Sequence, residues 1–197
     1  MKGSNLESTI NKTLADELWQ EFYSKKGRGW LAVKTDSMAP LIRPGDYVLM
    51  SQVPAEHIHP GDIVVFRRGN DKIVHRVLKI FRSDEGLRFT EKGDNSCVYR
   101  TFKADDVIGR VTTVKSQGKI FNLDSSPSRL ASRALSLWAY WTGTIVTRAR
   151  ASSNRNIKRL GRVLLRLSLL SSNALVRICC VVWYLSGLRY KESAESN

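Results

Sequence analysis

Cysteine is scarce in this chain of 197 residues. The three cysteines are Cys97, Cys179 and Cys180, an odd number with two of them adjacent. This count and spacing exclude a disulfide framework and match no pattern of zinc ligands. The sequence has no glycine-rich phosphate loop and no internal repeat, which disfavours nucleotide-binding and solenoid folds. It also lacks the charged start and apolar run of a secretory signal.

Acidic residues are missing from a long C-terminal stretch. Residues 128–191 contain twelve Lys and Arg and no Asp or Glu, so most of the formal net charge of +14 lies there. Two apolar segments, 134–147 and 167–188, flank the basic segment 148–166. A membrane span needs about 20 apolar residues. The first segment is short and the second is interrupted by Arg177, so neither has the pattern of an ordinary span.

We therefore expect residues 130–190 to bind an anionic membrane, because a basic amphipathic helix lies on such a surface. One alternative is a soluble helical pair, and another is a nucleic-acid-binding module. Nucleic acid is the less favoured partner, because no base-reading motif accompanies the charge. If both apolar segments spanned the bilayer, the basic loop would be cytoplasmic and the rest of the chain outside. If they only lie on the surface, the rest of the chain is cytoplasmic.

Short apolar runs separated by turns fill the middle of the chain. Glycine next to Asp or Asn marks most of the turns. This pattern predicts a mainly β domain of coiled, antiparallel strands over residues 30–120. The candidate strands are 31–33, 47–50, 63–66, 73–80, 87–90 and 107–114.

Helices are expected on both sides of this β domain. Leu6, Ile10, Leu14, Leu18 and Phe22 recur every four residues, which predicts an amphipathic helix. We divide the chain into the helix segment 1–29, the β domain 30–120, a linker 121–132 and a basic, apolar helical tail 133–197.

Three stretches of the β domain carry candidate catalytic residues. Residues 35–40 read Thr-Asp-Ser-Met-Ala-Pro and place Ser37 on a bend just before a strand. A serine becomes a nucleophile when a base reaches its hydroxyl; without a base, Ser37 is an ordinary surface residue. His75 lies inside a predicted strand, and imidazole is suited to act as that base. Asp94 lies in a Gly-Asp-Asn turn, where aspartate often caps its own backbone.

These stretches, with Pro60-Gly61-Asp62 and the run 107–111, resemble signal peptidase I in its endoplasmic-reticulum and archaeal-like branch. The resemblance covers roughly residues 30–115. It implies the coiled β fold that this family shares with self-cleaving repressor peptidases, with Ser37 as nucleophile, His75 as general base and Asp94 as acidic partner. The common bacterial branch and the self-cleaving repressors carry a lysine base instead.

The resemblance leaves the acidic partner open. Several members of the branch have a second acid about six residues beyond the Gly-Asp-Asn turn, and Arg100 stands there in this chain. Three interpretations stay open: Asp94 alone serves, Asp105 or Asp106 contributes, or the triad is weakened. The resemblance also implies an oxyanion hole made by the Thr35 hydroxyl and the Ser37 amide.

The leading hypothesis is a serine endopeptidase that cleaves a signal or leader peptide from a precursor, without metal or cofactor. His57 and His59 form a His-x-His pair, which is a weak metal signal and fits a surface turn. One alternative is a regulatory or self-cleaving protein of the same fold. The other is a non-catalytic membrane-binding or nucleic-acid-binding module that uses the basic tail.

Overall fold

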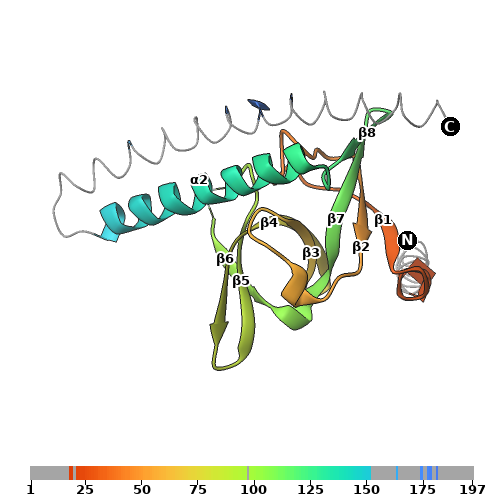
Figure 1. Cartoon of the computed structure of the whole chain (residues 1–197), viewed down its shortest axis with the longest axis horizontal. Helices are drawn as coiled ribbons and strands as arrows, with labels where there is room; N and C mark the ends of the chain where they lie inside the picture. Colours follow the sequence, from red (N-terminus) through yellow and green to blue (C-terminus); the bar gives the residue numbers. More distant parts are fainter. Residues whose placement is uncertain are drawn as a thin grey trace, which may run out of the picture.

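One curled antiparallel sheet forms the body of the protein (Figure 1). The computed structural model describes residues 18–19, 21–96 and 98–151 and the single positions 163, 174, 177, 178 and 181. The strand order is β1-β2-β7-β3-β4-β5-β6, and β8 pairs with β7. The mainly β, antiparallel core expected from the sequence is confirmed. The strands are β1 (Arg28–Ala32), β2 (Tyr47–Ser51), β3 (Ile63–Arg68), β4 (Asp71–Ser83), β5 (Gly86–Lys92), β6 (Arg100–Lys103), β7 (Val107–Ser116) and β8 (Lys119–Asn122).

Bulges and tight turns curl the sheet. The strand register shifts between β2 and β7, between β3 and β7, and between β4 and β5. A bulge bends its strand and increases the local twist, so three bulges close the sheet toward a barrel. Gly86 (φ 101°) allows the tight turn between β4 and β5, because its φ lies in a region that side chains disfavour.

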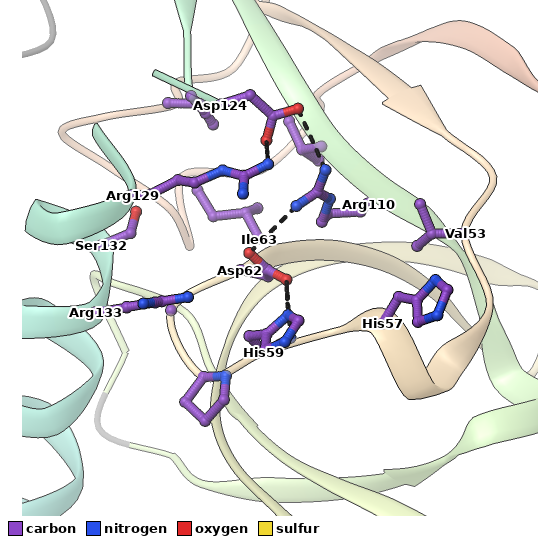
Figure 2. A pocket seen from close by; sticks show the side chains of 14 residues that line it. Val53, His57, His59, Asp62, Ile63, Arg110, Asp124, Arg129, Ser132 and Arg133 are labelled. Atoms are coloured by element: carbon purple, nitrogen blue, oxygen red, sulfur yellow. Dashed lines mark hydrogen bonds and ion pairs between the residues drawn. The ribbon is translucent and has the colours of Figure 1, made fainter. Parts of the chain in front are cut away.

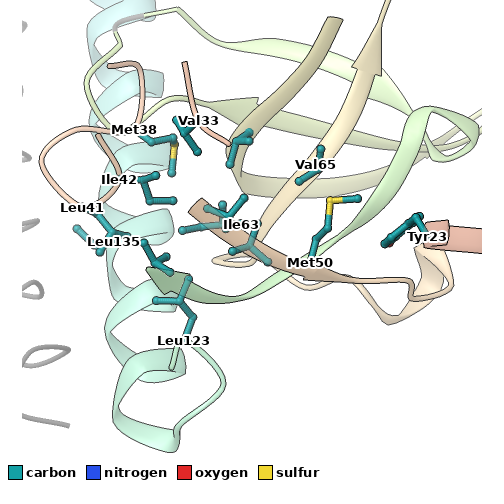
Figure 3. Packing of buried hydrophobic residues seen from close by; sticks show 14 residues of the cluster. Tyr23, Val33, Met38, Leu41, Ile42, Met50, Ile63, Val65, Leu123 and Leu135 are labelled. Atoms are coloured by element: carbon teal, nitrogen blue, oxygen red, sulfur yellow. The ribbon is translucent and has the colours of Figure 1, made fainter. Parts of the chain in front are cut away.

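Two apolar clusters lie on opposite faces of the central strands. Side chains alternate across a strand, so Val65 and Val74 face one cluster and Phe66 and Val77 face the other. The first cluster includes Met38 and Ile42 from the loop after β1 and also Leu135 (Figure 3). The second contains three stacked aromatic rings, from Phe66, Phe89 and Phe102.

A long helix, α2 (Ser126–Ala151), lies across one end of the sheet (Figure 1). Its buried residue Leu135 packs into the first cluster, and the Tyr99 hydroxyl donates a hydrogen bond to the Ala139 carbonyl at 2.9 Å. Because α2 begins at Ser126, it takes up more than half of the stretch that the sequence predicted as a linker. No helix among the described residues is long and apolar enough to cross a membrane.

The N-terminal helix is tied to the sheet by two aromatic residues. Residues 21–26 are helical, as are 18 and 19; the rest of the helix predicted over 6–24 lies outside the described residues. Trp19 Nε1 donates to the Trp30 carbonyl at 3.0 Å, and the Tyr23 hydroxyl donates to the Ile108 carbonyl at 2.9 Å. Tyr23 is buried, and burial raises the pKa of its phenol to about 12.

The contribution of Tyr23 to the free energy of unfolding should depend on pH in the alkaline range. Because folding raises the pKa of this phenol above the value of 10.0 in an unfolded chain, its contribution to stability is complete below pH 10. It should disappear as pH rises toward 12. We expect the difference in unfolding free energy between the wild type and Tyr23→Phe to shrink over this range, measured by urea unfolding. A difference that stays constant from pH 9 to pH 12 would contradict this.

Candidate active site

The loop after β1 holds Ser37 on a short, well-anchored turn. The amide of Ala39 donates to the Asp36 carbonyl at 2.9 Å, and that of Ile42 to the Met38 carbonyl at 3.1 Å. Met38 and Ile42 are fully buried in the first apolar cluster. Met38, the residue after Ser37, is therefore held in the core. This fixes the orientation of the turn that carries the serine hydroxyl.

His75 comes to this hydroxyl from the middle of β4. Its Nε2 lies 3.0 Å from Ser37 Oγ, within hydrogen-bond distance. The two residues are 38 positions apart in the sequence, so the fold alone brings them together. The imidazole is tilted against the Phe66 ring, with 6.3 Å between ring centroids. An alcohol in contact with an imidazole nitrogen is the arrangement of a serine nucleophile with its base.

The Gly-Asp-Asn turn holds the backbone of the serine loop. The Asn95 amide donates to the Ser37 carbonyl at 2.9 Å, and its side chain donates to the Asp36 carbonyl at 3.4 Å. Gly93 lies close against both Ser37 and His75. A Cβ on Gly93 would lie only 2.5 Å from the Ser37 carbonyl oxygen and 3.0 Å from His75 Nε2. Glycine is therefore the one residue that fits without displacing the serine–imidazole contact.

Asp94 does not approach His75. Its carboxylate accepts two hydrogen bonds from Arg76, with Nε at 2.8 Å and Nη2 at 2.6 Å. Arg76 is only 1% exposed, and its Nη1 also donates to the Gly61 carbonyl and to Ser132 Oγ. The structure thus places the predicted acidic partner on a buried arginine of the opposite sheet face.

Glu91 is the carboxylate beside His75. Its Oε2 lies 2.5 Å from His75 Nδ1, and its Oε1 accepts a hydrogen bond from Arg68 Nη2 at 2.5 Å. The Glu91 side chain is 1% exposed. Glu91 was not among the site residues expected from the sequence. Alternation of side chains places residues 91 and 94 on different faces, but only the pairing of β5 with β4 shows which of these faces carries His75.

Of the remaining predicted site residues, Thr35 lies next to Ser37, and Asp105 and Asp106 lie in a separate short helix. Thr35 Oγ1 is 3.3 Å from Ser37 Oγ, so the threonine hydroxyl is next to the serine. Asp105 and Asp106 belong to the short 3-10 helix η2 (Ala104–Asp106). Asp106 accepts a hydrogen bond from the Lys103 amide there, and Asp105 is exposed.

A separate pocket of about 290 Å³ lies between η1 (Ala55–His57), β7 and the start of α2. Four of its charged groups pair with one another: Asp124 binds Arg110 and Arg129, and Asp62 lies 3.8 Å from Arg110 (Figure 2). His57 and His59 line this pocket, whereas Ser37 and His75 do not. In the described part of the chain, no group of three or more His, Cys, Asp or Glu residues is arranged to hold a metal ion.

The fold and the serine–imidazole contact agree with the family comparison. The Peptidase S24-like family matches residues 4–112, more than half of the chain, and the chain belongs to this family. Over 69 residues it is also 39% identical to the protein named signal peptidase complex catalytic subunit SEC11C of Homo sapiens, and equally to those of Mus musculus and Canis lupus familiaris. These matches cover 34% of this chain and 36% of each relative, so the likeness spans about a third of their length.

The Arg76–Asp94 pair should be important for stability. Asp94→Asn keeps the shape of the side chain but leaves the buried guanidinium without its counter-charge. Breaking a buried ion pair on one side costs about 3–5 kcal/mol. We expect a loss of this order in the free energy of unfolding, measured by chemical denaturation. Glu85→Gln is the matched control, because its ion pairs with Arg88 and Lys103 are exposed, and it should change stability little.

Proposed function

We propose that this protein is a serine endopeptidase of the signal peptidase type. Ser37 Oγ attacks the carbonyl carbon of the scissile peptide bond while His75 Nε2 accepts its proton. The C–N bond of the tetrahedral intermediate breaks, and the imidazolium returns the proton to the departing amine. Water then hydrolyses the acyl-enzyme ester, with His75 again acting as the base. The reaction needs no oxidant, reductant or cofactor.

The observation that carries this proposal is the distance of 3.0 Å between Ser37 Oγ and His75 Nε2. A serine hydroxyl is a weak nucleophile at neutral pH unless a base removes its proton. Membership of a peptidase family and the likeness to a signal peptidase catalytic subunit support the same assignment. They also support a precursor with a signal or leader peptide as the substrate. In this proposal the residues just before the cut are small, such as Ala.

Two groups are proposed to stabilise the oxyanion. The Thr35 hydroxyl lies beside Ser37 Oγ, and the Ser37 amide belongs to the same turn. Hydrogen-bond donors held in advance near a developing negative charge lower the barrier, because they need little reorganisation during the reaction. In this proposal Thr35 and the Ser37 amide bind the oxygen of the tetrahedral intermediate.

The nucleophile is tested by Ser37→Ala, which removes one oxygen and leaves the anchoring residues Met38 and Ile42 in place. We expect cleavage of a precursor peptide with Ala before the cut to fall by about 10³-fold or more. The unfolding midpoint should stay close to that of the wild type. A variant that cleaves the peptide at the wild-type rate would rule out Ser37 as the nucleophile.

We also propose that residues 130–190 hold the protein on an anionic membrane. Support comes from the outer face of α2, which lies opposite the buried residues Leu135, Ala139 and Val146. Exposed arginines lie around this face, and the absence of acidic residues from 128–191 makes it complementary to anionic lipids. Tryptophan is enriched where proteins meet the membrane–water interface. The exposed apolar residues of this face are Leu130, Leu137, Trp138, Trp141 and Ile145.

The membrane proposal is tested by placing one negative charge on this face. Ile145 is 52% exposed on α2, and Ile120 is 51% exposed on β8. We expect Ile145→Glu to weaken sedimentation of the full chain with phosphatidylcholine–phosphatidylglycerol vesicles, because it removes apolar contact and adds repulsion. Ile120→Glu makes the same chemical change elsewhere and should bind as the wild type does. Equal binding by both variants, or no binding by the wild type, would contradict the proposal.

A further inference from the structure

We infer that Glu91, held by Arg68, is the carboxylate that positions the base His75, and that Asp94 does not have this role. This inference rests on the proposed function of Ser37 and His75 and adds a residue that acts through the imidazole. The observation behind it is a continuous line of contacts from Arg68 through Glu91 and His75 to Ser37.

The register of β4 and β5 explains why Glu91 reaches the imidazole. Arg76 pairs with Lys92 and Val77 with Glu91, so residue 93, just beyond the end of β5, follows on the side of His75. Residues 91 and 93 therefore share the sheet face of His75. Position 93 is a glycine, so it carries no side chain that could contact the ring, and Glu91 is the nearest residue of this face that does. A diagonal neighbour of this kind is within reach of a long side chain such as glutamate.

Asp94 lies on the other face of the same ladder, where it meets Arg76. Its two oxygens are both engaged by the guanidinium, at 2.8 Å and 2.6 Å. Reaching His75 would require Asp94 to leave this pair and cross the sheet. The carboxylate is thus committed to the contact between the sheet and α2.

Arg68 fixes which oxygen of Glu91 faces the base. It donates to Oε1 from one side and also lies over the Phe66 ring at 5.2 Å. Oε2 is left to accept a hydrogen bond from the N–H at His75 Nδ1. With the proton on Nδ1, the lone pair of Nε2 points to Ser37 Oγ, as a base requires. The carboxylate also stabilises the imidazolium that forms during the reaction.

The charged groups around His75 are few. Glu91 contacts Nδ1, and Arg68 contacts Glu91 from behind. Arg100 of β6 stands opposite Glu91 in the β5–β6 ladder. On the other face of β4, Arg76 and Asp94 neutralise each other. Glu91 is therefore the one negative group among them that bears directly on the ring.

Glu91→Gln tests this inference because Arg68 would orient the new amide. The amide oxygen should take the place of Oε1 beside Arg68, which turns the NH₂ group toward His75 Nδ1. Nδ1 must then accept a hydrogen bond, so the proton moves to Nε2 and the ring can no longer take the serine proton. We expect the rate constant for peptide cleavage to fall by about 10²- to 10⁴-fold. Glu85→Gln, on the β4–β5 turn, is the matched control.

The imidazole itself provides a readout that does not depend on turnover. In ¹⁵N spectra of histidine-labelled protein, neutral His75 should carry its proton on Nδ1 in the wild type and on Nε2 in Glu91→Gln. Asp94→Asn should keep the wild-type tautomer. His57 and His59 serve as internal references, and a His75→Gln sample assigns the signals. An unchanged tautomer in Glu91→Gln would overturn the inference even if the wild type is an active peptidase.

A second substitution separates positioning from general damage. Arg68→Met removes the group that orients the amide but keeps packing against Phe66. In the double variant Arg68→Met/Glu91→Gln the amide is free to turn its oxygen to His75, so the rate should recover at least about tenfold over Glu91→Gln alone. A rate that falls further would mean that Glu91 acts only in the packing. If the wild type cleaves no peptide but the tautomer still differs between the wild type and Glu91→Gln, the proposed function is wrong and the positioning of His75 by Glu91 is supported.

Discussion

The buried guanidinium of Arg76 is the contact on which the rest of the structure depends. It joins four segments that are distant in sequence: β4, the Gly-Asp-Asn turn through Asp94, the turn at Gly61, and α2 through Ser132. Removing an arginine from water is costly, and a buried ion pair adds little net stability compared with apolar packing. The pair instead enforces one arrangement, because any displacement of the turn or of α2 leaves a buried charge without its partner.

The same arrangement places Ser37 beside His75. Asp94 holds its turn against Arg76, and the next residue, Asn95, holds the Ser37 carbonyl with its amide. One face of the β4–β5 ladder therefore stabilises the fold, and the other carries His75 and Glu91 toward the serine. Alternation along a strand separates these two tasks, so a charge needed for structure does not compete for the base.

The β core and the Ser37–His75 meeting could be anticipated from the sequence, because strand runs, glycine turns and family resemblance all point to the same fold. Which carboxylate contacts His75, Asp94 or Glu91, could not be predicted from the sequence. The answer depends on which residue of β5 pairs with which residue of β4. A shift of register by one residue would exchange the two faces. The start of α2 was also missed: Ser126 and Pro127 have the composition of a linker, yet serine and proline are common at the first positions of a helix.

The arginine at position 100 makes physical sense once the register of β5 and β6 is known. The family resemblance implies an acid near position 100, where this chain has Arg100, and Arg100 stands opposite Glu91 in the β5–β6 ladder. An acid at position 100 would place a second negative charge opposite a buried carboxylate, which is unfavourable for directly opposed strand residues. An arginine there adds a positive charge on the side away from His75. The register therefore pairs the buried carboxylate of Glu91 with a cation, and not with a second acid, across the β5–β6 ladder.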